Sequence, residues 1–132
     1  MAIINFGSIN IDHVYQVEHF VQPGETIAST HYQTLLGGKG ANQSIALAQA
    51  GADVRHVGSI HENDASFKQA LIKKGVDCRG VRCSETPSGH AIIQVTPSGE
   101  NAIVLFGGAN QTITAKTVMA ALDDAKPSDW VL

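Results

Sequence analysis

Short, nearly continuous apolar runs separated by turns dominate the pattern of hydrophobic and polar positions along this 132-residue chain. A strand buried on both faces of a parallel sheet has this pattern, because both sets of its side chains pack against other elements. The runs predict buried strands at residues 3–6, 54–60 and 76–81, and a further strand that begins at Trp130.

Helical patterns fill the intervals between these strands. They predict helices at residues 42–49, 65–74 and from 114 or 115 to 125. Asp64 is the expected N-cap of the second helix, and Gly51 and Gly75 stand where helices commonly end. Alternating strands and helices predict an α/β fold with a central, mostly parallel sheet flanked by helices.

Two groups of additional strands interrupt this alternation. The first lies at about residues 13–36 and contains a turn at Gln22-Pro23-Gly24-Glu25. The second, at about 89–106, is a hairpin around Pro97-Ser98-Gly99-Glu100. The two groups together predict a small separate sheet that stands over the loop ends of the main sheet.

The segment Leu36-Gly-Gly-Lys-Gly-Ala-Asn-Gln43 joins a predicted strand to a predicted helix. Its three glycines permit a close approach to a ligand, and the helix N-terminus with Lys39 favours ligand oxygens. Ala41 stands where a P-loop needs Ser or Thr, and Gln43 stands where a dinucleotide fingerprint needs its third glycine. The alternative is a purely structural glycine-rich turn with a solvated lysine.

Asn10 and Asp12 follow the first predicted strand with a spacing of two residues. In extended backbone their side chains point the same way, at the sheet edge where open α/β sheets bind ligands. A carboxylate beside an amide can accept from and donate to several hydroxyl groups of a sugar. The alternative is an Asx turn that satisfies its own backbone.

Composition narrows the function further. The chain has 43% hydrophobic and 16% charged residues and a formal net charge of −3, as in ordinary globular proteins. No basic run is longer than Lys73-Lys74, which argues against nucleic-acid binding. No apolar run approaches the ~20 residues of a membrane span, and the N-terminus lacks a basic region. We therefore expect a cytoplasmic protein without a membrane partner.

Two other groups of residues have simple explanations. Cys78 and Cys83, expected in a strand and in the turn after it, do not have the spacing of redox or zinc motifs and are interpreted as free thiols. The acidic and histidine-containing segment His61-Glu62-Asn63-Asp64 is interpreted as a polar loop before a helix rather than as a metal site.

With these residues in view, the chain resembles the ribokinase-like carbohydrate kinase family along its whole length. Gly7-Ser-Ile-Asn-Ile-Asp12 is similar to the first substrate motif of the family, and Pro23-Gly-Glu-Thr26 to its lid turn. Gly37-Gly-Lys-Gly-Ala-Asn-Gln43 is similar to its first signature, and Gly108-Ala-Asn110 recurs there. The segment 59–67 departs from the family pattern, because it keeps an acidic residue but lacks two glycines.

The resemblance implies a three-layer α/β domain with a small β-sheet lid, which clasps the lid of a second subunit in a homodimer. It implies transfer of the γ-phosphoryl group of ATP to the primary hydroxyl of a pentose, D-ribose, with Mg²⁺ and a monovalent cation such as K⁺. Fructose, deoxyribose or a nucleoside are alternative acceptors within the family.

The resemblance also implies a set of sugar-binding residues. They are Asn10, Ile11, Asp12, Gly38, Lys39, Gly40, Ala41, Asn42 and Ala91. The family's catalytic base, an aspartate in a Gly-Ala-Gly-Asp segment, lies in its C-terminal half with the nucleotide and cation sites. We therefore expect no catalytic, cofactor or metal residue among these 132.

The end of the sequence, Trp130-Val131-Leu132, has the pattern of a strand that has just begun. This leads us to expect a fragment that is inactive alone, the N-terminal part of a single domain. Two alternatives belong to other classes of protein. One is a non-catalytic module that binds a sugar or dimerises, and the other is a nucleotide-binding oxidoreductase domain, which the missing third glycine disfavours.

Overall fold

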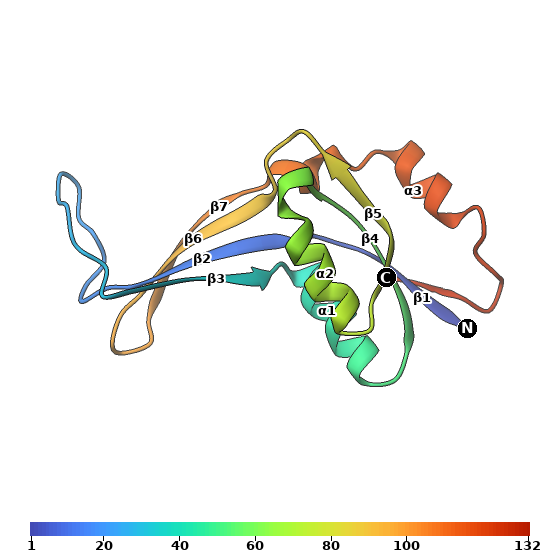
Figure 1. The fold of residues 1–132 in the computed structure, drawn as a ribbon, viewed down its shortest axis with the longest axis horizontal. Helices are drawn as coiled ribbons and strands as arrows, with labels where there is room; N and C mark the ends of the chain where they lie inside the picture. The colour runs from blue at the N-terminus through green and yellow to red at the C-terminus, as the bar shows by residue number, and fades with distance from the viewer.

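A computed structural model describes all residues, 1–132, and shows two four-stranded sheets (Figure 1). The main sheet has the strand order β5-β4-β1-β8 and all of its pairs are parallel. Its strands are β1 (Ala2–Phe6), β4 (Asp53–His61), β5 (Asp77–Ser84) and β8 (Trp130–Val131). The four predicted strands of the central sheet are therefore confirmed, including the short one at the end of the chain.

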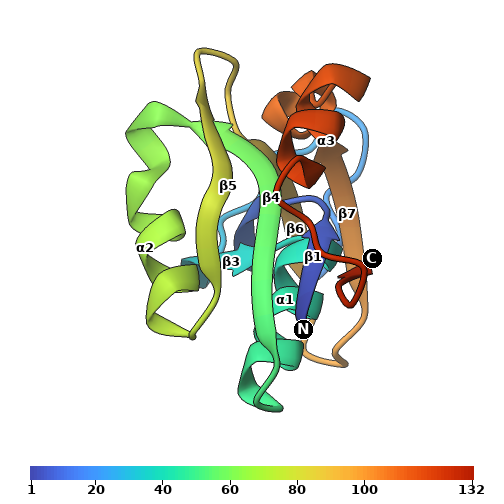
Figure 2. The same cartoon turned by 90° about the vertical axis from the view of Figure 1, so that its right-hand side faces the viewer.

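Three α-helices cover this sheet on both faces (Figures 1 and 2). Helices α1 (Lys39–Gln49) and α2 (Ala65–Lys73) lie on one face, and α3 (Ala115–Leu122) lies on the other. The core under α1 and α2 is a cluster of seven buried residues, to which the sheet contributes Ile60, Cys78 and Val81 and the helices contribute Ala41 and Leu71. The predicted three-layer α/β architecture is confirmed.

The second sheet, with the order β3-β2-β6-β7, extends away from the main sheet (Figure 1). Its strands are β2 (Asn10–Gln16), β3 (His31–Gly37), β6 (Gly89–Val95) and β7 (Asn101–Phe106). The outer pairs are antiparallel, whereas β2 and β6 in the middle are parallel. The two predicted groups of strands thus come together in one sheet, which connects to the core through the start of β2 and the end of β3.

Three predicted boundaries are wrong for reasons of pairing and charge. Residues 26–30 are not a strand, because β2 ends at Gln16, which pairs with His31, so that no residue of β2 lies opposite them. Strand β5 continues to Ser84, opposite the end of β4, so Cys83 lies in the strand and not in a turn. Helix α3 stops at Leu122 and not at residue 125, since acidic residues are unfavourable at a helix C-terminus.

The starts of the first two helices differ in how well they were predicted. Helix α1 begins at Lys39, three residues before the predicted start, with Gly38 as its cap. Asp64 occupies the predicted N-cap position of α2, but its side chain makes no capping hydrogen bond, and a short 3₁₀ turn at Glu62–Asp64 leads directly into the helix. The Asp64 carboxylate instead accepts a hydrogen bond from the Ser88 hydroxyl at 2.6 Å. A second 3₁₀ turn, Gly108–Thr112, follows β7.

None of the helices has both the length and the apolar character that crossing a bilayer requires. Both cysteines are free, but their surroundings differ: Cys83 is exposed, whereas Cys78 lies in the core. Burial raises the pKa of the Cys78 thiol to about 11.

We expect one fast and one protected thiol in the folded protein. Only the thiolate reacts with disulfide reagents, so both burial and the raised pKa protect Cys78. Dithiobis(nitrobenzoic acid) should label Cys83 rapidly and Cys78 only after unfolding, and Cys83→Ser should abolish the fast phase. Equal rates at both positions would contradict the placement of Cys78 in the core.

Candidate functional site

The glycine-rich loop packs directly against the connection between β1 and β2. Gly38 has a φ of +96°, and a Cβ there would lie 2.6 Å from the Ser8 carbonyl oxygen. A Cβ on Gly7 would lie 2.5 Å from the Cα of Gly40. The Ala41 amide donates to the Ser8 carbonyl at 3.0 Å. The glycines are therefore required for backbone packing, which also explains why α1 starts so close to β2.

Asp12 lies on β2 at the base of the second sheet, beside this loop. Its partners across the sheet are Leu35 on β3 and Ala91 on β6, and its carboxylate packs against Gly37. No hydrogen bond from the protein reaches the carboxylate. Burial raises its pKa, and the charge of neighbouring His13 partly offsets this effect. Asp12 is therefore a half-buried acceptor whose hydrogen-bonding capacity is unused.

Asn10 is held by a residue from the far end of the chain. Its Oδ1 accepts a hydrogen bond from Asn110 Nδ2 at 2.8 Å, and Asn110 Oδ1 accepts from the Ile9 amide at 2.9 Å. The Asx-turn alternative is therefore wrong, since Asn10 does not satisfy its own backbone. The arrangement leaves the Asn10 amide group free to donate. The sequence drew attention to the Gly108-Ala-Asn110 segment but gave no sign of this pairing across 100 residues.

The other predicted residues on α1 divide into two kinds. Gly40 and Ala41 are buried, and the Ala41 amide is bonded to the Ser8 carbonyl, so that neither residue offers a ligand a side chain. Lys39 and Asn42 are exposed on the first turn, and Lys39 takes part in none of the ion pairs. The helix N-terminus and the lysine together favour oxygen ligands at this point.

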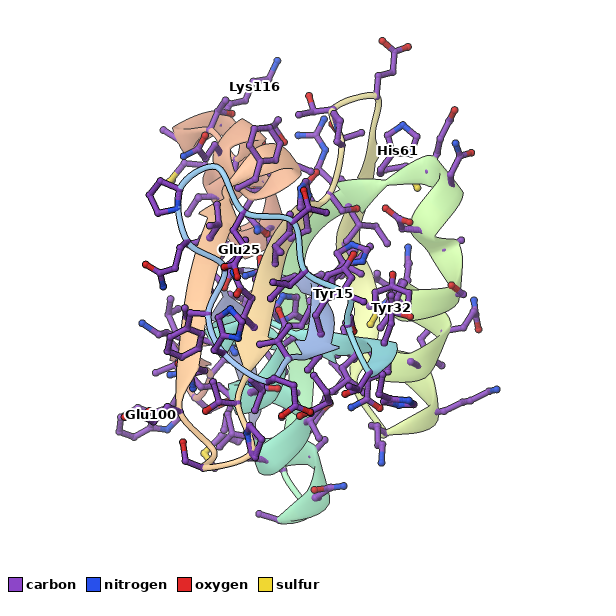
Figure 3. The ribbon with its side chains drawn as sticks, turned by 90° about the vertical axis from the view of Figure 1, so that its left-hand side faces the viewer. Tyr15, Glu25, Tyr32, His61, Glu100 and Lys116 are labelled. Carbon is purple, nitrogen blue, oxygen red and sulfur yellow. The ribbon has the colours of Figure 1, made fainter.

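Ile11 is the predicted site residue that the fold separates from the others. Because side chains alternate along a strand, it faces the side of the second sheet opposite to Asn10 and Asp12. There it lines a hollow of about 420 Å³ together with His13, His90 and residues near the end of β4. Figure 3 shows His61 above this face and Tyr15 next to Tyr32, whose rings lie 4.8 Å apart. Ile11 can therefore reach the candidate site only through its backbone.

The arrangement combines one unused carboxylate, free amide donors, an exposed lysine and closely packed backbone at the carboxyl end of β1. Ala91 is buried beside the carboxylate and supplies an apolar wall. Mixed donors and acceptors around a partly apolar surface suit a small polyhydroxylated ligand.

Comparison with known proteins gives consistent matches over the whole chain. The sequence model of the pfkB family of carbohydrate kinases matches residues 2–131. A ribokinase from Haemophilus influenzae is 40% identical over 129 residues, which cover 96% of this chain and 42% of that protein.

Solved structures agree with this result. Ribokinase from Cryptococcus neoformans var. grubii, in complex with ADP, is 40% identical with a TM-score of 0.76, covering 82% of this chain and 35% of that one. Arabidopsis thaliana ribokinase complexed with ribose and ATP is 36% identical with a TM-score of 0.73, covering 83% and 38%. The chain thus spans less than half the length of the relatives that it matches.

Proposed function

Because the chain belongs to the pfkB family of carbohydrate kinases, we propose that it is the sugar-binding part of a longer, cytoplasmic, ribokinase-type enzyme. The reaction is transfer of the γ-phosphoryl group of ATP to the primary hydroxyl of D-ribose. One observation carries the proposal: in a chain 40% identical to a ribokinase, a half-buried carboxylate without a donor faces a glycine-rich helix N-terminus.

We assign the hydrogen bonds to the sugar as follows. The Asp12 carboxylate accepts from two hydroxyl groups, and the free amide of Asn10 donates to a neighbouring oxygen. Backbone at Gly38, Gly40 and Ala41 and the side chains of Lys39 and Asn42 complete the cradle, and Ile11 contributes backbone alone. Ala91 covers the sugar from β6. These assignments follow from the residue types and from their positions. Each residue lies at the junction of β2 with the glycine-rich loop or directly opposite on β6.

The donor side of the reaction belongs to the rest of the longer enzyme. No group of three His, Cys, Asp or Glu side chains converges as metal ligands in this chain. From the resemblance to ribokinases, we propose that ATP, Mg²⁺, the monovalent cation and the catalytic base bind or lie outside residues 1–132. Two relatives support a nucleotide partner, since one was solved with ADP and another with ribose and ATP.

We further propose that a second copy pairs with the second sheet. Strand β7 exposes large apolar side chains on both faces: Leu105 and Ile103 on the face of Asp12, and Phe106 and Val104 on the other. Each of the four is at least 49% exposed. Neighbouring apolar residues exposed to this degree mark interaction surfaces. The second sheet would then serve both as the lid over the sugar and as the dimer contact.

Sugar binding should release protons through Asp12. Sugar hydroxyls stabilise the carboxylate and lower the pKa that burial raises in the free protein. Between these two pKa values the free protein carries more protons than the complex, so affinity falls as the pH is lowered through this window. Calorimetry in buffers of different ionisation enthalpy measures the effect. Asp12→Asn should abolish it, and unchanged proton release from that variant would exclude Asp12.

A coupled assay for ADP release tests the proposed reaction. The longer protein encoded by the continuous reading frame should phosphorylate D-ribose in the presence of ATP, Mg²⁺ and K⁺, faster than fructose, deoxyribose or a nucleoside. Residues 1–132 alone should give no turnover, because positioning of the donor and proton removal are both missing. Faster phosphorylation of another acceptor would show that the proposed substrate is wrong. A longer protein without kinase activity would favour the alternative of a non-catalytic binding module.

A further inference from the structure

Three fully buried polar side chains form a continuous hydrogen-bonded chain beneath the candidate site. Asn5 on β1, Ser44 on α1 and His56 on β4 each have an exposure of 0%. Asn5 Nδ2 donates to Ser44 Oγ at 2.9 Å, and Ser44 Oγ lies 2.8 Å from His56 Nδ1. The chain therefore links two neighbouring strands of the main sheet to the first turns of α1.

Both ends of this chain reach the backbone that builds the site. Asn5 Nδ2 also donates to the Gly40 carbonyl at 3.0 Å, and His56 Nε2 lies 3.1 Å from the Gly7 carbonyl. Gly7 and Gly40 are the two residues whose backbones touch where the loop meets the β1–β2 connection. Each contacting segment is thus fixed from below by one end of the same polar chain.

The acceptors determine where the hydrogens lie. A carbonyl only accepts, so His56 Nε2 carries the hydrogen toward Gly7, and in the neutral ring Nδ1 accepts from the Ser44 hydroxyl. Burial lowers the pKa of His56, which the Gly7 hydrogen bond partly opposes, so the ring is neutral near pH 7. Its neighbours on β1, the β1–β2 connection and α1 are Asn5, Gly7 and Ser44, none of which titrates in this range.

The polar chain is maintained at a cost. Asn5 Oδ1 is buried without any hydrogen-bond partner. Its orientation is fixed, since turning the amide would place two oxygens against each other at Gly40. Apolar side chains at the three positions would remove the unpaired Asn5 oxygen, but they would also remove the donors to the Gly7 and Gly40 carbonyls. Packing alone therefore does not account for this arrangement, whereas control of the Gly7–Gly40 contact does.

We propose that Ser44 and His56 are positioning residues that hold the β1–β2 connection and the glycine-rich loop at the spacing at which both reach one sugar. This inference rests on the proposed function. Neither residue touches the sugar: His56 acts through the Gly7 carbonyl, and Ser44 acts through Asn5 and His56. Asn10 and Asp12 follow Gly7, and Lys39 and Asn42 flank Gly40, so a shift at this contact separates the two halves of the cradle.

Paired substitutions in the longer enzyme separate the two hydrogen bonds of the ring. His56→Gln keeps a donor near the Nε2 position for Gly7, whereas His56→Asn keeps only an acceptor near the Nδ1 position for Ser44. Ser44→Ala interrupts the polar chain in the middle. Ser66→Ala makes the same change at an exposed position of α2 and is the matched control. Affinities for D-ribose and for ATP are measured for each variant, together with the melting temperature.

We expect Ser44→Ala and His56→Asn to weaken ribose binding about tenfold to a hundredfold, because small misplacements of binding groups have effects of this size. ATP affinity should stay unchanged, and His56→Gln should recover most of the loss. Nitrogen-15 shifts of labelled His56 should report hydrogen on Nε2 alone. Below the pH at which Nδ1 gains a proton, the ring becomes a buried cation that can no longer accept from Ser44, and ribose affinity should fall in step with the histidine signal.

Three results would overturn the inference. The first is wild-type ribose affinity in both Ser44→Ala and His56→Asn. The second is a loss of ribose affinity that is accompanied by an equal loss of ATP affinity and a lower melting temperature. The third is a hydrogen on Nδ1 of neutral His56. If the unsubstituted longer enzyme binds no sugar, the proposed function fails first and the positioning role fails with it. If the unsubstituted enzyme and the variants all bind ribose normally, only the positioning role of Ser44 and His56 is wrong.

Discussion

Asp12→Ala should weaken ribose binding by the longer enzyme about a hundredfold or more. A hydrogen bond to a charged group contributes about 1.5–3 kcal/mol, and the carboxylate is assigned two of them. In the free protein no hydrogen bond reaches the Asp12 carboxylate, and burial raises its pKa. The two hydrogen bonds to the sugar are therefore gained in full on binding and are lost in the variant. Calorimetry with D-ribose measures the loss directly, and the KM for ribose follows it in the kinase assay.

The same substitution should not destabilise the free protein at neutral pH. With a raised pKa, the Asp12 carboxyl supports folding in its protonated form, and that support is lost as the pH rises through the folded-state pKa. Removing the charge should therefore leave the melting temperature at pH 7 unchanged or higher. Asp64→Ala removes a carboxylate beside the hollow on the opposite face and is the matched control. Equal losses of ribose affinity from both variants would contradict the site.

Gly38→Val should abolish measurable ribose binding and lower the stability of the fold. A side chain at the Gly38 φ of 96° and ψ of 131° costs about 1–3 kcal/mol in backbone strain alone. The new Cβ would also lie 2.6 Å from the Ser8 carbonyl oxygen and 2.9 Å from the Asn10 amide, which are backbone atoms that cannot turn aside. Relief requires that the loop and the start of β2 move apart, and this movement separates Asp12 from α1.

Gly99→Val is a control that separates the effect of backbone strain from the effect of moving the loop away from β2. Gly99 has a φ of +84° in the turn between β6 and β7, but a Cβ there would meet no atom within 4 Å. The control should therefore lose a similar amount of stability through strain and keep its ribose affinity. Thermal unfolding and calorimetry on both variants give the comparison. A Gly38→Val protein with normal ribose binding would show that the loop is purely structural.

The sequence predicted the elements that depend on local pattern. The apolar runs at 3–6 and 54–60 are strands of the main sheet, and the glycines at 51 and 75 follow helix ends with positive φ. Boundaries that depend on partners were missed. Strand β3 starts where β2 offers it a partner, and α1 starts where Gly38 packs onto the β1–β2 connection, neither of which can be deduced from nearby residues.

The candidate site shows the same division. Asn10 and Asp12 were recognised from their spacing, and the glycine-rich loop from its composition. Asn110, which orients Asn10, was not predicted to do so because 100 residues separate the pair. His56 and Ser44 sit inside otherwise ordinary strand and helix patterns. Their alignment with Asn5 exists only after β1, β4 and α1 have packed together.

The fold decides which residues of β2 belong to the candidate sugar site. Alternation along β2 puts Asp12 on one face of the second sheet and Ile11 with His13 on the other, although these residues are adjacent in the chain. The hollow on the face of Ile11 is lined by three histidines and, apart from Ile11, by none of the candidate sugar-binding residues. A ligand bound in this hollow would therefore not support the sugar site, even though Ile11 belongs to the same motif as Asp12.

Mapping of D-ribose binding by nuclear magnetic resonance tests whether the junction of β2 with the glycine-rich loop binds the sugar. Nitrogen-15-labelled residues 1–132 are titrated with D-ribose and, separately, with NAD. We expect ribose-dependent shifts that saturate together at the amides of Asp12, Gly38, Asn42 and Ala91, and no response of these amides to NAD. Shifts confined to the hollow around His61 and His90, or a response of the loop to NAD but not to ribose, would contradict the assignment of this junction as a sugar site.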